Sequence, residues 1–595
     1  MEKETRTCQN CKQDFMIEPE DFGFYKKMDV PAPTFCPDCR LQRRLAFRNE
    51  KALYKRKCDL TRQDIISVHS QDSGFIVYNI RDWFSDKWDA ATYGEDPDFS
   101  KTFFDQFHNF MHAVPRMSLM LDYPTITNSD YNNLAGHLKN CYLVSEADFN
   151  ENCAYANSIK HSKDSFDILI GQNLELSYEC VNCRKCNRTL FSEDCEDCFN
   201  VSFSKDLVGC SNCVGCVGLR KKQYHIFNQP YAQEEYRKKL EELRLDSRVS
   251  LGEIRKKALS LWEKFPRKYM HGRHNTNVSG DYIYFSKNSV HCNEVVGVED
   301  SKYCDIISLK PARGCYDYTE WGNNAESLYE CLTVGEGANS IRFSNLVWTS
   351  VRKVEYSMEC RNSSNLFGCI GLNNKQYCIF NKQYSEEKFN ELRAKLIRHM
   401  DDQPYVDKNG IIYKYGEFFP VALSPFAYNE TSAQDFLPLT KETAAERGYR
   451  WKDQKEKNYQ ITKKFQDIPG DIKDVTDAFL NDIIECQHRG KCNHQCTSAF
   501  KLISSELSFY RSMNIPLPVL CSNCRHGERI ERRNPRKYWH RKCACGGIVS
   551  ENNIYQNTTS HFHGAEPCPN EFETSYAPDR PEIVYCEACY NSEVT

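Results

Sequence analysis

The feature that most limits how this chain can fold is a cysteine-rich segment that occurs twice, once toward each end. Residues 24–40 read FYKKMDVPAPTFCPDCR and residues 509–525 read FYRSMNIPLPVLCSNCR, in register at a constant offset. The correspondence continues through Lys57-Cys58 and Lys542-Cys543. A register kept between such distant segments predicts a duplicated module that brackets the middle of the chain.

The chain is too long for one hydrophobic core. It has 595 residues, and single cores stop growing near about 250–300 residues, so three or more domains are expected. The beginning, MEKETRTCQN, lacks the apolar run of a signal peptide, and no segment has the roughly 18 apolar residues of a membrane span. We therefore expect a cytoplasmic protein without membrane contact. In a reducing compartment its 32 cysteines predict metal ligands and buried thiols, not a disulfide framework.

The amino-terminal module has the spacing of a structural zinc site. Cys8, Cys11, Cys36 and Cys39 form two well-separated CxxC pairs, which suits two knuckles that present four thiolates to one tetrahedral ion. Four buried thiols without metal are the alternative, but so small a lobe buries too little apolar surface to fold alone. All four positions are filled, so the zinc is expected to be structural.

The carboxy-terminal module is expected to hold two more ions, giving about three zinc ions in the chain. One site is predicted at Cys492, Cys496, Cys521 and Cys524, and another at Cys543, Cys545, Cys586 and Cys589. Cys568, His561 or His563 could replace a ligand of the second site. In the amino-terminal copy only Cys58 remains of that site, because Asn79 and Asp82 stand where Cys586 and Cys589 stand.

A basic stretch follows each CxxCR motif, with local net charges of about +7 and +6. Arginine clusters beside a rigid knuckle suit phosphate backbones, because the guanidinium fork pairs with phosphate oxygens. The alternative is an intramolecular face whose arginines pair with acidic groups elsewhere in the chain. The candidate nucleic-acid-binding residues are Arg40, Arg43, Arg44, Arg48, Lys55, Arg56, Lys57, Arg525, Arg529, Arg532, Arg533, Arg536, Lys537, Arg541 and Lys542.

The middle of the chain repeats short polar and cysteine-containing runs. Cys141 and Cys153 are about 12 residues apart, as are Cys186 and Cys198, and no helical stripe accompanies the period. Such spacing is typical of short strands turned at polar corners, and two such units would give a parallel β-solenoid with coils of roughly 20–24 residues. Asn and Asp are expected at the corners and Cys and Ser in the interior ladders.

A second solenoid unit is expected after the first. SYEC at 177 recurs as LYEC at 328, and CVGLRKKQYHIFNQPY at 216 recurs as CIGLNNKQYCIFNKQY at 369. Each unit leads into an amphipathic helix, near 232 and near 385, that is predicted to cap the open end. The CxxCxxC runs at 180 and 210 resemble iron–sulfur ligand runs, but residues 363 and 366 of the second unit are Ser and Leu, which favours buried thiols.

The predicted architecture is multidomain and mainly β. Between module and solenoid, Ser100 is expected to cap a helix with Phe103, Phe107 and Phe110 on one face, and Asn409-Gly410 is expected to turn a hairpin. The predicted domains are a zinc-ribbon module at 1–82, a helical connector at 83–127, solenoid units at 128–246 and 247–400, a connector at 401–485 and a double zinc-ribbon module at 486–595.

CxxC followed by FYxxMxxPxPxxCPxCR resembles the zinc-ribbon domains of many bacterial proteins, over a short segment at each end. The whole layout resembles a family of uncharacterised cysteine-rich zinc-ribbon proteins from uncultured bacteria with small genomes. The resemblance implies zinc and this architecture, and no particular activity.

Three functions fit the sequence. The first is a non-enzymatic protein whose zinc ribbons bind RNA or DNA, with the solenoid as a rigid spacer. The second is a protein–protein scaffold or a homo-oligomer. The third is an enzyme with a solenoid groove in which Asp317 and Glu320 would act, and only fold analogy supports it.

Overall fold

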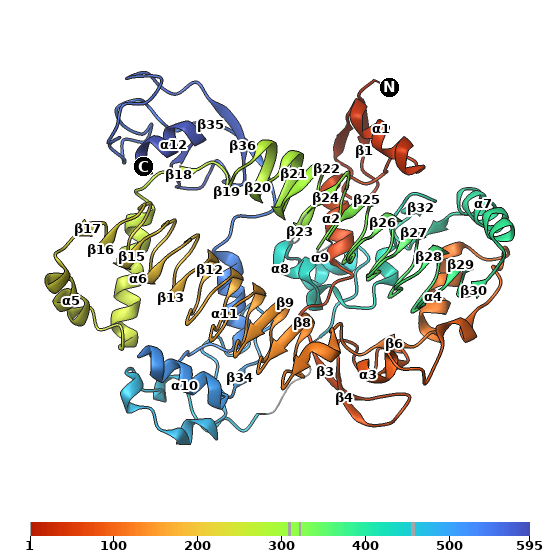
Figure 1. Ribbon diagram of the computed structural model, residues 1–595, viewed down its shortest axis with the longest axis horizontal. Coiled ribbons are helices and arrows are strands. Elements are labelled where there is room, and N and C mark those ends of the chain that lie inside the picture. The colour runs from red at the N-terminus through yellow and green to blue at the C-terminus, as the bar shows by residue number, and fades with distance from the viewer. Residues whose placement is uncertain (1, 308–310, 321–322, 454–458, 595) are drawn as a thin grey trace. The chain divides into compact units, whose positions relative to one another are not determined.

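The computed structural model describes residues 2–307, 311–320, 323–453 and 459–594. The chain is mainly β, and its middle is a β-solenoid, as predicted. It separates into two units, each built from two distant segments of the chain (Figure 1). Unit 1 contains Met1–Leu119 and Met270–Asp453, and unit 2 contains Met120–Tyr269 and Gln454–Thr595. The amino-terminal module therefore belongs with the later stretch of solenoid, and the carboxy-terminal module with the earlier one.

The solenoid stretch of unit 2 is made of short parallel strands. One sheet contains β7 (Ile126–Thr127), β8 (Asn133–Lys139), β9 (Ser145–Glu151), β10 (Asn157–Lys160), β11 (Leu169–Gln172) and β12 (Val181–Arg184). Another contains β13 (Asn187–Leu190), β14 (Phe199–Ser202), β15 (Ser211–Val214) and β16 (Gln223–Ile226), closed by antiparallel β17 (Gln229–Pro230).

The coil of this stretch is shorter than the sequence analysis predicted. Asn157 pairs with Ser145 and Leu169 pairs with Asn157, so equivalent positions of successive coils are 12 residues apart. The predicted coil of roughly 20–24 residues was wrong, because the period seen in the sequence is a whole coil and not half of one.

The backbone of this stretch turns at every third residue. Asn140, Leu143 and Glu146 have φ of 54°, 50° and 51°, which is the left-handed region. One residue of each triplet points inward, as Cys141 and Val144 do. Each coil therefore contributes four side chains to the interior, and equivalent side chains of successive coils stack in ladders.

This triplet pattern accounts for the CxxCxxC runs. Cys180, Cys183 and Cys186 occupy consecutive interior positions and are buried. Their thiols donate to backbone carbonyls, for example Cys180 Sγ to the Thr189 oxygen at 3.2 Å. Among the described residues, no solenoid cysteine belongs to a group that could hold a metal ion. These cysteines are buried in the interior, as the predicted ladder of thiols requires.

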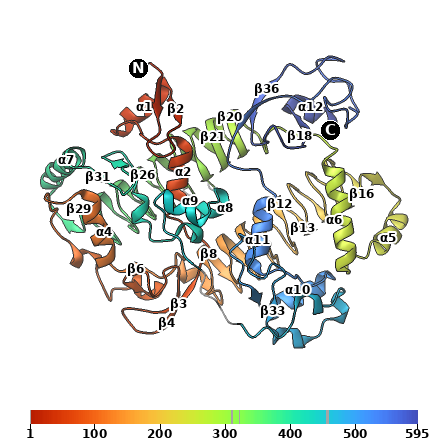
Figure 2. The same ribbon diagram turned by 180° about the vertical axis from the view of Figure 1, so that it is seen from behind.

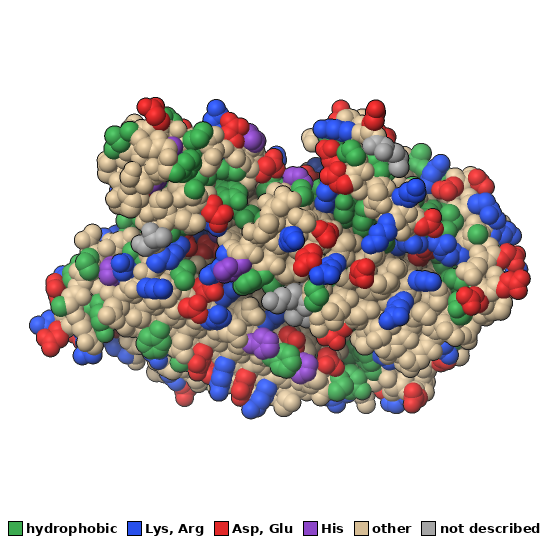
Figure 3. Space-filling model, turned by 45° about the horizontal axis from the view of Figure 1, so that its top comes forward, with side chains coloured by type: hydrophobic (Ala, Val, Ile, Leu, Met, Phe, Trp, Pro, Cys, Tyr) green, Lys and Arg blue, Asp and Glu red, His purple; other side chains and the backbone are tan. Residues whose placement is uncertain are grey.

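Polar side chains stack on the outside in the same register. Amide ladders run from Asn128 to Asn140 at 3.0 Å, on to Asn152 at 3.1 Å and to Asp164 at 2.8 Å, which confirms Asn and Asp at the corners. Lys139 Nζ lies 2.9 Å from Glu151 of the next coil. Rows of alternating acidic and basic side chains are visible on the surface (Figure 3).

The solenoid stretch of unit 1 has a less regular coil. Equivalent residues are 11 apart at Asn277 and Asn288 but 14 apart at Ser301 and Cys315. Its strands are β19 (Gly272–Arg273), β20 (Thr276–Tyr284), β21 (Lys287–Val296), β22 (Val298–Lys302), β23 (Asp305–Ile307), β24 (Ala312–Arg313), β25 (Ala325–Tyr329), β26 (Asn339–Arg342), β27 (Arg352–Glu355), β28 (Ser364–Phe367), β29 (Gln376–Ile379) and antiparallel β30 (Lys382–Gln383).

Helices follow the closing hairpins, as predicted. In unit 2, α5 (Gln233–Glu242) places Tyr236 5.6 Å from the Tyr224 ring, and α6 (Arg248–Trp262) comes next. In unit 1, α7 (Glu386–Asp402) places Phe389 5.8 Å from the Tyr377 ring. Among the described residues, no helix combines the length and apolar character needed to cross a bilayer.

The connecting segments of unit 1 pack on its solenoid. The predicted helix is α4 (Phe103–Ala113), but Thr102 caps it instead of Ser100, because the Thr102 hydroxyl accepts from the Asp105 amide. Phe103 contacts the rings of Tyr356 and Phe367. The predicted hairpin is formed by β31 (Tyr405–Val406) and β32 (Ile412–Tyr413), and α8 (Ser432–Phe436) and α9 (Lys441–Glu446) follow.

The two terminal modules share one order of elements. The amino-terminal module contains β1 (Glu4–Thr7), β2 (Asp14–Ile17), α1 (Pro19–Met28), α2 (Pro37–Leu45), β3 (Tyr54–Lys57), β4 (Asp64–Ser67), β5 (Val77–Tyr78), α3 (Ile80–Trp83) and β6 (Arg116–Met117), which pairs with β5. The carboxy-terminal module contains β33 (Ile484–Glu485), β34 (Ala499–Phe500), α10 (Ser504–Met513), α11 (Ser522–Glu531), β35 (Trp539–Lys542), β36 (Glu571–Thr574), β37 (Val584–Tyr585), which pairs with β18 (Arg267–Lys268), and α12 (Glu587–Val594). Even the left-handed residues that end α1 and α10, Asp29 and Asn514, correspond.

Candidate metal centres and the docking interface

The amino-terminal module brings its four predicted ligands together. The Sγ atoms of Cys8, Cys11, Cys36 and Cys39 lie within 4.8 Å of one another. The two knuckles meet at Cys11 and Cys36, whose Sγ atoms are 3.7 Å apart, and the Cys36 amide donates to Cys8 Sγ at 3.2 Å. Tetrahedral zinc with Zn–S bonds of about 2.3 Å would hold its sulfurs about 3.8 Å apart, so these residues fit the ion.

The next cluster differs from the sequence prediction by one ligand. Cys486 joins Cys496, Cys521 and Cys524, and Cys492 lies outside this group of four. Cys486 takes the place that Cys8 has in the other module, because the Cys521 amide donates to its Sγ at 3.3 Å. The long loop between Cys486 and Cys496 hid this pairing, since a knuckle is normally recognised by a shorter spacing.

The last cluster also exchanges one predicted ligand for an alternative. Cys543, Cys586 and Cys589 are grouped with Cys568, whose Sγ lies 3.9 Å from Cys586 Sγ. Cys545 instead groups with His561, His563 and Cys589. The amide of Cys586 donates to Cys543 Sγ at 3.1 Å, and Asn570 Nδ2 donates to Cys586 Sγ at 3.3 Å.

The part of the amino-terminal module that corresponds to the last cluster keeps the same backbone hydrogen bond to a cysteine but lacks the other possible ligands. The Asn79 amide donates to Cys58 Sγ at 3.2 Å, as the Cys586 amide does to Cys543. The Asn79 side chain caps α3, and Asp82 pairs with Lys87. Among the described residues, no group of possible metal ligands includes Cys58.

The arginines after each CxxCR motif form a docking interface with the solenoid of the same unit. In unit 1, α2 lies against the solenoid strands (Figures 1 and 2). Asp317 accepts a hydrogen bond from Arg40 Nε at 2.9 Å and forms an ion pair with Arg44 at 3.2 Å. Arg43 contacts Glu330 at 2.8 Å, and Arg48 pairs with Glu320.

Unit 2 repeats this interface with different partners. Asp167 forms an ion pair with Arg525 Nε at 2.9 Å and accepts a hydrogen bond from Arg529 Nη1 at 3.0 Å, and α11 lies along β9–β12 (Figures 1 and 2). Aromatic contacts repeat as well. Phe24 stacks on Tyr316 at 3.7 Å in unit 1, and Phe509 stacks on Phe166 at 4.5 Å in unit 2.

These ion pairs are removed from water. The side chains of Arg40, Arg44, Asp317, Arg529 and Asp167 are at most 1% exposed. A buried charge is costly unless an opposite charge lies beside it. The pairs therefore fix where each module sits on its solenoid.

Two carboxyl groups of the interface respond differently to burial. Burial, with Glu417 and Asp317 nearby, raises the pKa of Glu330 to about 7 against the opposing effect of Arg43. Burial would also raise the pKa of Glu179, but Arg529, Arg532 and Arg525 outweigh it and hold the pKa below its usual value. The Glu179 carboxylate is therefore ionised in unit 2 at neutral pH.

The predicted nucleic-acid-binding residues consequently divide by exposure. The buried members are Arg40, Arg43, Arg44, Arg48, Arg56, Arg525, Arg529 and Arg536. Arg532, Arg533 and Arg541 are half-buried, and Lys55, Lys57, Lys537 and Lys542 are more open to solvent. The intramolecular alternative therefore describes the α2 and α11 arginines. Asp317 and Glu320, the acids of the enzyme hypothesis, are partners in the same interface and are 0% and 2% exposed.

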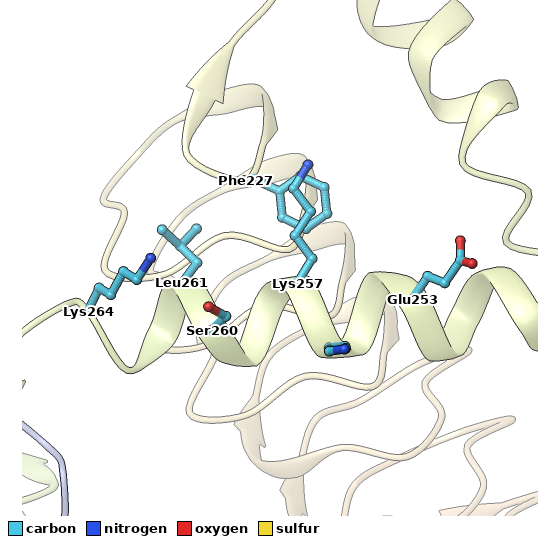
Figure 4. Close-up of a pocket in the computed structure, with 7 residues that line it drawn as sticks. Phe227, Glu253, Lys257, Ser260, Leu261 and Lys264 are labelled. Atoms are coloured by element: carbon cyan, nitrogen blue, oxygen red, sulfur yellow. The ribbon is translucent and has the colours of Figure 1, made fainter.

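One hollow of about 470 Å³ lies along α6 in unit 2 (Figure 4). The Lys257 ammonium sits 4.0 Å above the Phe227 ring, and Lys264 and Glu253 extend at the two ends of the labelled group. The described lining residues are Phe227, Glu253, Lys256, Lys257, Ser260, Leu261 and Lys264. These seven side chains offer no pair of acids and no activated nucleophile, so they do not define a catalytic site.

Comparisons with known proteins add little to this geometry. No protein-family model and no curated protein sequence matches the chain. A crystal structure of a putative acetyltransferase from Desulfovibrio desulfuricans G20 aligns with 49% of this chain and 85% of its own, at 9% identity and a TM-score of 0.10. A TM-score this low carries no conclusion about fold or activity.

Proposed function

We propose that the protein is a non-enzymatic, zinc-dependent scaffold in which terminal zinc-ribbon modules are fastened to a rigid solenoid that binds other proteins. The observation that carries the proposal is the repeated interface, in which one aspartate receives two arginines of a cysteine-anchored helix in each unit. A zinc ion at each four-cysteine cluster beside that interface would fix the start of the helix, since Cys36 and Cys521 are the N-cap residues of α2 and α11.

The outer faces of the solenoid support the scaffold role. They present ladders of side chains at regular intervals, and Phe149, Phe199 and Phe285 remain about half exposed. Repeat architectures offer such extended surfaces to protein partners or to a second copy of the chain. The many reduced thiols of the interior fit a reducing compartment, which agrees with a cytoplasmic location.

Nucleic-acid binding is the competing proposal, and it now rests on fewer residues. Lys57 and Lys542 occupy equivalent hairpin positions in the two modules, and Lys55 and Lys537 add to the charge that solvent can reach. Binding through these lysines would weaken steeply with salt. Charge reversal of the buried arginines cannot test it, because it would break the docking interface itself.

The test is to purify the protein in its native state, quantify its metal, and identify co-purifying molecules by sequencing and by cross-linking mass spectrometry. Zinc with a protein partner or self-association that survives high salt supports the scaffold. Enriched RNA or DNA that is lost when Lys55, Lys57, Lys537 and Lys542 are changed to Glu would favour nucleic-acid binding instead. Absence of bound metal would overturn the zinc-dependent part of the proposal.

A further inference from the structure

The first cysteine pair is spaced differently in the two modules. Two residues separate Cys8 from Cys11, whereas nine separate Cys486 from Cys496. The longer loop carries three additional residues of the kinds that bind zinc, namely His488, Cys492 and His494. The carboxy-terminal module therefore contains more candidate ligands than one tetrahedral ion can use.

These three residues gather around a ligand of the first cluster. His488, Cys492, His494 and Cys524 have ligand atoms within 4.8 Å of one another. Cys492 Sγ lies 3.6 Å from Cys524 Sγ. Cys524 thus belongs to two groups of four, its own four-cysteine cluster and this one.

The imidazoles are arranged as metal ligands usually are. Nδ1 of His488 and Nδ1 of His494 are buried without a hydrogen-bond partner. The other nitrogen of His494, Nε2, lies 2.7 Å from the Glu531 carboxylate. A histidine that binds metal through one nitrogen commonly has its other nitrogen held by a carboxylate, which fixes the tautomer and the ring orientation.

Helix α11 leaves room for this ring at a glycine. A Cβ at residue 527 would lie 2.4 Å from Cγ of His494, closer than any side chain can approach. The corresponding residue of the amino-terminal module is Gln42, and that module has no histidine loop. Gly527 is therefore the helix position that admits the second ligand set.

The last cluster shows the same arrangement with other residues. Cys545 Sγ lies 3.0 Å from His561 Nδ1, and His563 Nε2 lies 3.2 Å from Cys589 Sγ. The remaining nitrogens are held from outside, since His561 Nε2 lies 2.8 Å from Glu593 and His563 Nδ1 lies 2.6 Å from the Glu566 carbonyl. Cys589 is again a member of two groups of four.

We infer that the carboxy-terminal module holds two pairs of zinc ions, and that the thiolates of Cys524 and Cys589 each bridge one pair. In both pairs one ion has four cysteine ligands, and the other has two histidines, one cysteine and the bridging cysteine. Each pair then has five thiolates for two Zn²⁺ ions, a net charge of –1, whereas the single four-cysteine site of the amino-terminal module carries –2. The shared thiolate and the two neutral histidines together lower the negative charge per ion. This inference rests on the proposed zinc binding and raises the expected content to five ions, one for each group of ligands.

Native mass spectrometry of the full chain, purified with zinc, counts the ions. Five ions are expected in the wild type, four in His494→Ala and in His561→Ala, and three in Cys524→Ser, which loses both ions of its pair. The matched control is His540→Ala, because His540 is an exposed histidine outside every ligand group found among the described residues and should leave five ions bound.

A second measurement uses only the wild-type protein, so its result does not depend on whether a variant folds. In wild-type protein loaded with ¹¹³Cd, two pairs of cadmium signals should show metal–metal coupling through the shared sulfur, and the amino-terminal site should show none. Three ions per chain and uncoupled signals would overturn the bridged pairs and leave the scaffold proposal standing. A protein without bound metal would overturn both the bridged pairs and the zinc-dependent part of the scaffold proposal.

Discussion

Units 1 and 2 fasten a terminal module to a solenoid in the same way, yet they differ in what holds the module together. The aspartate that receives two arginines is Asp317 in unit 1 and Asp167 in unit 2. The amino-terminal module has one candidate metal cluster among its described residues, whereas four groups of ligands lie in the carboxy-terminal module. The two docking interfaces therefore share the helix that follows the CxxC pair, and the additional possible ligands of the carboxy-terminal module lie outside this shared interface.

Unit 1 also shows what takes the place of a possible metal site. Where unit 2 has Cys586 and Cys589, unit 1 has Asn79 and Asp82, beside the buried Trp83. Trp83 packs against Trp88 at 5.7 Å and donates to the Pro115 carbonyl at 3.1 Å. Apolar burial and a helix cap stabilise this position, where unit 2 has a group of possible metal ligands.

The largest difference between the units is expected from loss of a ligand of a four-cysteine cluster. In Cys36→Ser the amino-terminal module should unfold, because the proposed structural zinc would supply on the order of 10–16 kcal/mol of apparent binding energy, comparable to the stability of a whole domain. Hydrogen exchange measured by mass spectrometry should show loss of protection in α1 and α2, with α10 and α11 unchanged. Cys58→Ser, at the replaced site, should leave α2 protected. Equal loss in both variants would contradict the distinction between the two sites.

Removal of the shared aspartate should be the next largest effect. Asp317→Ala leaves Arg40 and Arg44 buried without their partner, which is expected to destabilise unit 1 by about 3–5 kcal/mol. Asp167→Ala should do the same to unit 2 only. Hydrogen exchange in α2 and in α11 reports on the two units separately. Glu151→Ala, which removes an exposed partner of Lys139, is the control and should change neither helix.

Adding one methyl group to a helix glycine of each module tests the second ligand set. The glycines are Gly527 in α11 and Gly23 in α1. Gly527→Ala should displace His494 and lower the bound zinc from five ions to four, although alanine favours the helix by about 1 kcal/mol. The control is Gly23→Ala in α1, where no atom lies within 4 Å of the added methyl, and it should keep all five ions. Native mass spectrometry measures both. Retention of the fifth ion in Gly527→Ala would show that His494 is not a ligand.

The smallest expected effect concerns the solenoid corners, which the two units share. Asn140 has φ of 54° and links Asn128 to Asn152. Asn140→Ala loses the side-chain ladder and the preference for left-handed φ, which should lower the free energy of unfolding by about 1–2 kcal/mol. Asn140→Gly loses the ladder but still adopts left-handed φ easily, so it should lower the free energy of unfolding by about 1 kcal/mol. Asn288, which links Asn277 to Asp300 in unit 1, should respond similarly. Chemical denaturation compares the variants, and a larger loss for glycine than for alanine would contradict this account.

The sequence reveals the local parts of this structure well. The module register, the buried thiols and the capping helices follow from patterns within short segments, such as the pairing of Cys36 with Cys39. Cys486 was not predicted as a ligand, because an expanded loop separates it from Cys496. His488 and His494 lie in that loop, next to the CxxxC formed by Cys492 and Cys496. These histidines were the signal that could have identified the loop as rich in possible ligands.

The choice of solenoid for each module could not be predicted. Asp167 and Asp317 occur in similar surroundings, SFDI and CYDY, and both offer a carboxylate to an arginine. Which of two similar acids meets Arg40 depends on chain connection and on packing between segments far apart in the sequence. For the same reason the arginines suggested a phosphate-binding surface, since their buried partners are distant in sequence.

Because each unit pairs distant segments, the two units differ in which side of the docking interface is synthesised first. Arg40 precedes Asp317 by 277 residues, so in unit 1 the arginines of the module are made first and wait for the solenoid. Asp167 precedes Arg529 by 362 residues. At about 5–20 residues per second, the solenoid of unit 2 waits roughly 20–70 s with its acidic face open to water. During that interval a chaperone or a neighbouring nascent chain could compete for the place that α11 later takes.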